Sequence, residues 1–183
     1  MSDPVSALGQ VSYDGFARVQ EIGPLGMISL RTKPDVPGLA EAVRAVTGTA
    51  VPTHRRIEVT GDKAAGWMSS DEYLLILPYD QTGAALASLA VALTGQHHLA
   101  VVVSDARAVF RITGDKADQV LRKLAPVDMD RMTDGELRRT RVAQVAAAFW
   151  RDGDGFTLVC FRSVAGYVMG LLTHSARTGS ELR

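Results

Sequence analysis

The 183-residue sequence contains a single cysteine, Cys160, which excludes an internal disulfide and any site built from several cysteines. One lone thiol is typical of a reducing compartment, so we expect a cytoplasmic protein. Aromatic residues make up only 6% of the chain, whereas 46% of the residues are hydrophobic and 22% are charged. This composition is typical of a globular protein and excludes the disordered and fibrous classes.

The sequence also lacks net charge, because twenty Lys and Arg balance twenty Asp and Glu. Nucleic acids and anionic membranes attract proteins largely through excess positive charge, so we expect neither as a partner. The longest apolar run, residues 84–93 with one serine inside it, is far shorter than the roughly 18 residues of a membrane helix. Residues 1–10 show no basic stretch followed by an apolar one, and we expect no secretory signal.

Strand and helix patterns alternate along the chain from residue 26 onward. The first half predicts strand, helix, strand, strand, helix and strand at 27–31, 35–48, 56–60, 72–77, 80–95 and 98–103. The second half predicts strand, helix, strand, strand and helix at 107–112, 117–124, 139–150, 156–162 and 163–172. A turn-rich stretch is expected at 61–71. The tetrad 152–155, which reads Asp-Gly-Asp-Gly, predicts a hairpin.

These patterns predict an α+β protein made of two successive ferredoxin-like split β-α-β units, each an antiparallel sheet with helices on one face. We expect an N-terminal extended arm over 1–25, which would grip a neighbouring chain. A first βαββαβ unit would follow over 26–104 and a second βαββα unit over 105–178. Residues 179–183 would form a C-terminal tail.

No pattern in the sequence indicates a catalytic or metal centre. His97 and His98 are adjacent, so a strand would point them to opposite faces, and the other two histidines stand alone. Phosphate-loop, dinucleotide and nucleophile-elbow motifs are absent from the sequence. Cys160 shares a strand face with Phe156 and Leu158, which predicts a buried and inert thiol. The sequence therefore predicts no catalytic, cofactor-binding or metal-binding residue.

Two clusters of charge have a structural interpretation. Asp128 and Asp130 lie in a turn-like context, which is more typical of solvated chain ends than of an acid/base pair. Arg138, Arg139 and Arg141 lie at the start of a strand and follow two acidic residues. This pattern favours a solvated or salt-bridged sheet edge.

Five motifs, in the same order along the chain, resemble one known family. They lie at 66–78, 103–114, 126–128, 139–145 and 162–163, and the segment 6–8 adds to them. The first reads GWMSSDEYLLILP and the second VSDARAVFRITG. In these motifs the sequence resembles the gamma subunit of heterotetrameric sarcosine oxidase, and the likeness extends over most of the chain.

The resemblance implies a subunit of a four-chain enzyme that oxidatively demethylates sarcosine to glycine, transfers the one-carbon unit to tetrahydrofolate and forms hydrogen peroxide. In that family the alpha chain holds NAD and the folate site, the beta chain holds FAD and FMN, and the delta chain holds zinc. The gamma chain is similar in fold to part of the aminomethyltransferases and has no cofactor. We therefore expect a non-catalytic assembly subunit whose partners are the alpha, beta and delta subunits.

Aromatic and arginine side chains often anchor subunit interfaces. The candidates in this sequence are Tyr13, Phe16, Trp67, Tyr73, Trp150 and Arg162. An alternative function stays open: a free-standing folate or one-carbon binding protein related to aminomethyltransferases, with its ligand between the two units. A folate would then stabilise the purified chain against heat.

Overall fold

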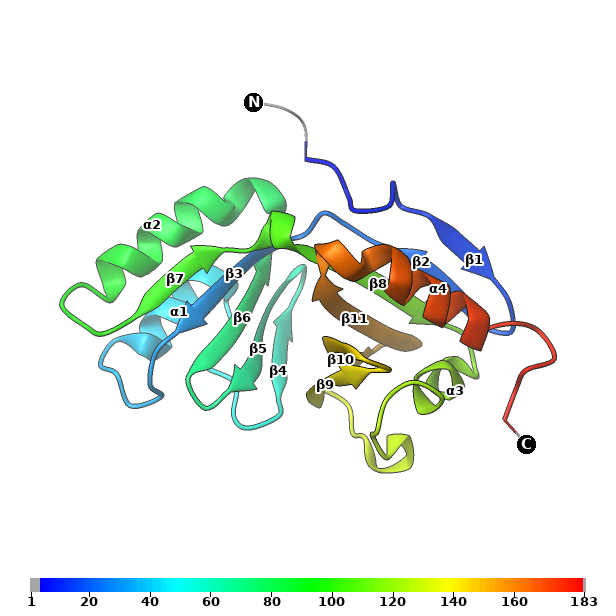
Figure 1. Cartoon of the computed structure of the whole chain (residues 1–183). Coiled ribbons are helices and arrows are strands. Elements are labelled where there is room, and N and C mark those ends of the chain that lie inside the picture. Colours follow the sequence, from blue (N-terminus) through cyan, green and yellow to red (C-terminus); the bar gives the residue numbers. More distant parts are fainter. Residues whose placement is uncertain (1–3, 183) are drawn as a thin grey trace. The chain divides into compact units, whose positions relative to one another are not determined.

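The computed structural model describes residues 4–182, which form two compact units (Figure 1). The central unit comprises Leu25–Ser104. The terminal unit joins residues 4–24 to residues 105–182. Each unit contains one antiparallel sheet with helices packed on one of its faces, which is the predicted α+β class.

The central unit has a five-stranded sheet with the strand order β4-β5-β6-β3-β7. Its elements are β3 (Gly26–Arg31), α1 (Leu39–Thr47), β4 (Ile57–Thr60), β5 (Lys63–Ser69), β6 (Glu72–Leu77), α2 (Thr82–Ala92) and β7 (Leu99–Val102). One sheet face packs against α1 and α2 around Leu30, Leu75 and Leu89. The apolar residues that recur every three to four positions along the two helices thus face the sheet, as the helical patterns predict.

The end of α1 agrees with its sequence pattern. Val43 and Val46 face the core, and Gly48 follows the last turn with a φ of 73°. Its backbone N–H donates to the carbonyl oxygen of Arg44 at 2.8 Å. Glycine adopts this left-handed conformation at little cost, so Gly48 ends the helix where the sequence predicts.

The sequence analysis missed β5, because it placed a turn-rich stretch at 61–71. The side chains of Ala64, Ala65 and Gly66 are too small to give a strand pattern. The strand nevertheless pairs with β4 on one side and β6 on the other. Ala65 and Trp67 face the helices, so the backbone ladder and not side-chain bulk defines this element.

The terminal unit has a six-stranded sheet with the strand order β1-β2-β8-β11-β10-β9. Its elements are β1 (Ser12–Asp14), β2 (Arg18–Glu21), β8 (Arg107–Thr113), α3 (Ala117–Arg122), β9 (Leu137–Val142), β10 (Val145–Asp152), β11 (Gly155–Phe161) and α4 (Ala165–Ser175). Helices α3 and α4 cover one face around Phe110, Phe149 and Leu158.

Residues 12–21 correct the expected extended arm, because they form two strands of the terminal sheet. β2 pairs with β8 and places Val19, which is fully buried, in the core. The strands β2-β8-β11-β10 then have the ferredoxin-like order, with β2 in the place of the strand that would follow the last helix. The predicted βαββα unit is therefore completed by a strand from the beginning of the chain.

Residues 139–150, predicted as one strand, form β9 and β10. The turn between them contains Ala143, whose φ is 51°, and Gln144. A turn without glycine or proline gives little sequence signal, so the single-strand prediction was wrong. The hairpin predicted at 152–155 is confirmed, since Asp152 of β10 lies opposite Gly155 of β11.

Candidate functional site

Histidines and clustered acidic residues do not form a metal site in the part of the chain that the structure describes. Among residues 4–182, no group of three or more His, Cys, Asp or Glu side chains could hold an ion. His54 packs edge-on against Trp67, and Nδ1 of His98 lies 3.0 Å from the carbonyl oxygen of Gln96. None of the described helices combines the length and apolar character needed to span a membrane.

Cys160 lies on β11 with its side chain in the core of the terminal unit, only 2% exposed. Burial raises the pKa of its thiol to about 11, while the nearby charge of Arg107 lowers this pKa and that of Glu21 raises it further. The thiolate is the nucleophilic form of cysteine. At neutral pH Cys160 is therefore a protonated core residue, as its sequence pattern predicts.

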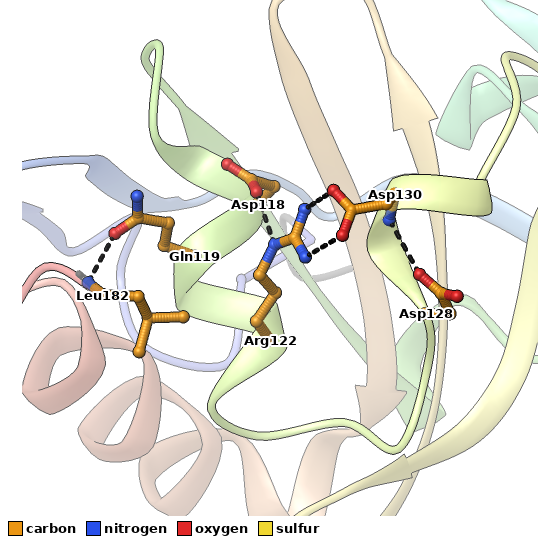
Figure 2. A network of polar contacts seen from close by, with 6 residues as sticks. All are labelled: Asp118, Gln119, Arg122, Asp128, Asp130 and Leu182. Atoms are coloured by element: carbon orange, nitrogen blue, oxygen red, sulfur yellow. Dashed lines mark hydrogen bonds and ion pairs between the residues drawn. The ribbon is translucent and has the colours of Figure 1, made fainter.

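Arg122 is the centre of the polar network shown in Figure 2. Its Nε donates to Oδ2 of Asp118 at 2.7 Å, and its Nη1 donates to Oδ2 of Asp130 at 2.8 Å. Oδ1 of Asp128 accepts the backbone N–H of Asp130 at 3.1 Å. The hydrogen bond from Arg122 holds the pKa of the Asp130 carboxyl below its usual range. Asp128 and Asp130 thus act in holding α3 to the following turn.

The end of the described chain is also fastened to α3. Oε1 of Gln119 accepts the backbone N–H of Leu182 at 2.7 Å (Figure 2). Nζ of Lys123 donates to the carbonyl oxygen of Ser175 at 2.7 Å and to both oxygens of Ser180. These contacts explain why the described part of the C-terminal tail lies against its own unit.

Glu21, at the end of β2, is a buried carboxylate that the sequence analysis did not single out. It is 1% exposed. Its Oε2 accepts the hydroxyl of Ser6 and the backbone N–H groups of Leu8 and Gln10, each at 2.9 Å. Three donors satisfy an acceptor that would otherwise be costly to bury. A single Glu in a short strand gives no signal of this fold-back, so only the structure reveals it.

Arg162 fastens the same segment from another direction. Its Nη1 donates to the carbonyl oxygen of Val5 at 2.9 Å and its Nη2 to that of Ser6 at 3.1 Å. A surface cavity of about 610 Å³ lies here, lined by Ala7, Ala106, Phe161, Arg162 and Ser163. The Phe161 ring is 48% exposed, and the guanidinium carbon of Arg107 lies 4.1 Å from its centroid. Nη1 and Nη2 of Arg162 thus bind carbonyl oxygens of the same chain, and a contact of Arg162 with a partner stays a prediction.

Trp67 lines a cavity of about 520 Å³ within the central unit, which we call the Trp67 pocket. The indole and the imidazole of His54 meet edge to face, with centroids 4.6 Å apart and planes at 84°. Burial raises the pKa of the Tyr73 phenol, which forms another part of the wall. The lining residues are Pro34, Val51, Pro52, Thr53, His54, Trp67, Ser70 and Tyr73. This wall contains no Asp, Glu, Lys or Arg, which suits an apolar or aromatic group.

The structure separates the predicted interface residues by their exposure. Tyr73 and Trp150 are 2% and 5% exposed, so their side chains offer almost no surface to a partner. Tyr13, Phe16 and Trp67 are half-buried and pack against the core of their own units. These three keep part of their rings accessible, and their contact with a partner stays a prediction.

Solved structures share this fold. A chain of the heterotetrameric sarcosine oxidase from Corynebacterium sp. U-96 aligns with a TM-score of 0.80 and 23% identity, over 90% of this chain and 87% of that chain. Aminomethyltransferase T of the glycine cleavage system from Bartonella henselae aligns with a TM-score of 0.63 and 16% identity, over 86% of this chain and 45% of that one. The fold thus places the protein in the class of α+β chains with ferredoxin-like units.

Sequence comparison narrows this class to one family. The model of the sarcosine oxidase, gamma subunit family matches residues 31–177. The sarcosine oxidase subunit gamma of Corynebacterium sp. (strain U-96) is 30% identical over 150 residues, which cover 79% of this chain and 71% of the relative. The chain belongs to the sarcosine oxidase gamma subunit family, and the resemblance found in its motifs is confirmed.

Proposed function

We propose that this chain is the gamma subunit of a heterotetrameric sarcosine oxidase, where it acts by assembly and performs no chemistry of its own. The observation that carries the proposal is the family match over residues 31–177. Its proposed partners are the alpha, beta and delta subunits, and its proposed compartment is the cytoplasm. The similar chain from Corynebacterium sp. U-96 belongs to an enzyme that is named heterotetrameric, which supports this assignment.

The proposed complex oxidatively demethylates sarcosine to glycine, transfers the one-carbon unit to tetrahydrofolate and forms hydrogen peroxide. In this proposal FAD, FMN, NAD, zinc and the folate belong to the other subunits. The polar groups of this chain support that division. The Cys160 thiol is buried, the Asp130 carboxylate is bound to Arg122, and Glu21 already accepts three hydrogen bonds. Groups with partners in their own chain are poor candidates for catalysis.

The surfaces proposed to contact other subunits contain the accessible aromatic rings. Aromatic side chains give large contact area at low entropic cost and dominate interface energies. Tyr13 and Phe16 lie in the N-terminal segment of the terminal unit, and Trp67 lines the Trp67 pocket in the central unit. We propose these rings as contacts of the assembled enzyme.

Co-expression tests the proposed function. The tagged chain would be produced with and without the alpha, beta and delta subunits and followed by size-exclusion chromatography with light scattering. We expect one complex that contains all four chains, and we expect its yield to fall when this chain is omitted. A chain that stays monodisperse by itself and never elutes with the other subunits would contradict the proposal.

Tetrahydrofolate separates the proposal from the free-standing folate-binding alternative. A ligand that binds only the native state raises the melting temperature by linkage. We expect saturating tetrahydrofolate to leave the melting temperature of the purified chain unchanged. A rise in that temperature would favour the alternative function.

A further inference from the structure

In the central unit, α2 and β7 contact each other, and each of them exposes apolar residues (Figure 1). Residues 81–104 contain no Asp, Glu, Lys or Arg, although 22% of the whole chain is charged. Val91 is 77% exposed, Leu99 57% and Val101 43%. Ala100 packs on the core beneath the helices, so its strand neighbours Leu99 and Val101 lie on the other face of the sheet. Apolar side chains exposed together along a strand are typical of an interaction site. We call the exposed residues of this strand the β7 surface: Leu99, Val101 and Val102.

β7 has an open edge among the described residues, since it pairs with β3 on one side only. The N–H of Val103 donates to the carbonyl oxygen of Met27 at 2.8 Å, which fixes the hydrogen-bonded positions of this pair. Such positions alternate along antiparallel strands. Leu99 and Val101 therefore bond to β3, whereas Ala100 and Val102 turn their N–H and C=O groups toward the open edge.

Other sheet edges carry charges that discourage strand pairing. β4, at the opposite edge of the same sheet, contains Glu58 and follows Arg55 and Arg56. β9, at one edge of the terminal sheet, contains Arg139 and Arg141. Charged residues, proline or a bulge usually protect a free edge. The β7 sequence LAVV contains no charge and no proline.

The terminal unit indicates what covers such an edge. Its strands β2-β8-β11-β10-β9 occupy the same order as β7-β3-β6-β5-β4 in the central unit. In the terminal unit β1 pairs antiparallel with β2, the strand equivalent to β7. The position of β1 has no counterpart among the described strands of the central unit. The same architecture thus takes one more extended segment at this edge.

Helix α2, which contacts β7, also carries small exposed residues. Ala84 and Ala87 are exposed, and a Cβ built at Gly83 would meet no other atom within 4 Å. Glycine within a helix lowers stability relative to alanine, and no described contact requires it here. Helix α2 therefore places no charged side chain next to β7.

We infer that β7 accepts an extended segment of a partner subunit as an additional strand of the central sheet. The inference rests on the proposed function, because it names a contact by which the chain would join its complex. Open N–H and C=O groups recognise a main chain in extended conformation. A charge buried against an uncharged surface is costly, so the segment presents small apolar side chains.

Two pairs of matched variants test the inference on the full chain together with the other three subunits. Ala100→Pro removes an N–H of the open edge, and Leu99→Lys places a charge on the surface. Val59→Pro and Val59→Lys are the controls, because Val59 is 60% exposed on β4 at the opposite edge. The measured quantity is the Kd for binding of this chain to the other three subunits. We expect the Ala100 and Leu99 variants to raise this Kd at least about tenfold and the controls to raise it less than about twofold.

Leu99→Lys serves as the decisive variant if Ala100→Pro does not fold, and the melting temperature of each isolated variant verifies folding. Amide hydrogen exchange supplies a second readout. We expect the amides of Ala100 and Val102 to exchange quickly in the isolated chain and to become protected in the complex. Protection together with the loss of affinity would support the inference.

Four outcomes would overturn it. A complex that forms while both amides keep exchanging, or a Leu99→Lys chain with unchanged Kd, would refute the strand addition and leave the proposed function standing. Protection that rises with the concentration of the isolated chain would identify a second copy as the occupant. Failure of the unmodified chain to join the other subunits would refute the inference and the proposed function together.

Discussion

The terminal and central units have sheets with the same strand order, but they differ in whether a further strand covers the edge formed by β2 in one and β7 in the other. In the terminal unit the start of the chain supplies β2 and then β1, so that the edge strand is a short one that contains Asp14. In the central unit the corresponding edge is β7, which is apolar and open among the described residues. The same strand order can therefore be closed by its own chain or left available to another.

The terminal unit also depends on contacts between distant parts of the sequence. Glu21 and Arg162 hold the segment 5–10, and Arg162 does so from more than 150 residues away. The central unit is a continuous stretch of chain, Leu25–Ser104. Two units with the same fold can therefore be stabilised by different kinds of contact, one within a continuous segment and one between distant segments. Four predictions test this difference.

The largest effect is expected from removing residues 1–21. The core of the terminal unit would lose Ala17 and Val19, and β8 would lose its neighbour, so we expect a destabilisation of at least about 4 kcal/mol. Urea unfolding followed by the fluorescence of Trp150 would measure it in a Trp67→Phe background. Arg18→Ala is the control, because this side chain is half-exposed on the same strand. Unchanged stability after truncation would restore the arm interpretation.

Alkaline pH should weaken the terminal unit through Cys160. The pKa of this thiol is about 11 in the folded chain, above its ordinary value of 9.0. Burial of the neutral thiol therefore contributes stability that is fully present below pH 9 and is lost as the pH rises through 11. The loss is about 2–3 kcal/mol. The experiment measures the unfolding free energy of the unmodified chain and of Cys160→Ala from pH 8 to about 11. The change with pH in the difference between the two chains gives the loss of stability due to the thiol.

If that difference does not change with pH, the thiol does not contribute to the alkaline response. The lysine and tyrosine residues present in both chains cancel in the comparison, so the variant isolates the effect of one group.

A smaller effect is expected from Glu21→Ala. The substitution leaves the hydroxyl of Ser6 and the N–H groups of Leu8 and Gln10 without their acceptor, which costs about 1–3 kcal/mol. Hydrogen exchange should increase at residues 8 and 10. Asp14→Ala removes a carboxylate that is 69% exposed, and its effect should stay within about 0.5 kcal/mol. Equal effects of the two substitutions would show that the buried acceptor does not hold this segment.

The smallest effect has the opposite sign. Gly83→Ala should stabilise the isolated chain by about 0.5 kcal/mol, because alanine has less freedom to lose on folding. The added methyl group meets no other atom within 4 Å. The matched variant in the terminal unit is Gly155→Ala, whose Cβ would overlap the carbonyl oxygen of Ile112. Thermal unfolding should show a higher melting temperature for the first and a lower one for the second.

The helices and the longer strands of this protein could be predicted from its sequence. Val43 and Val46 mark one side of α1, Gly48 marks its end, and the tetrad at 152–155 marks a hairpin. These signals are local, because each depends on residues within one turn of helix or one pair of strands. The motifs at 66–78 and 103–114 likewise identified the family, which the family match confirms. Recognising a motif requires only the order of its residues and no knowledge of their contacts.

Other features depend on partners that lie far away in the sequence. The sequence of β2 has no clear strand pattern, and its pairing with β8 is what defines it as a strand. β5 consists largely of small residues, so its sequence does not indicate a strand either. Glu21 became recognisable only when residues 6–10 lay around it. The exposure that separates Trp67 from Trp150 is a property of the packed chain and of no local pattern.

The sequence by itself determined the composition of a globular α+β chain, the periodicity of its helices and its membership of a family. Those properties follow from side-chain chemistry over short distances. The tertiary structure decided which strands share an edge, which carboxylate is buried and which edge stays open. Such choices follow from hydrogen bonds and packing between segments far apart in the sequence, and no short-range pattern encodes them. Met27 and Ser104, for example, are 77 residues apart and joined by a hydrogen bond.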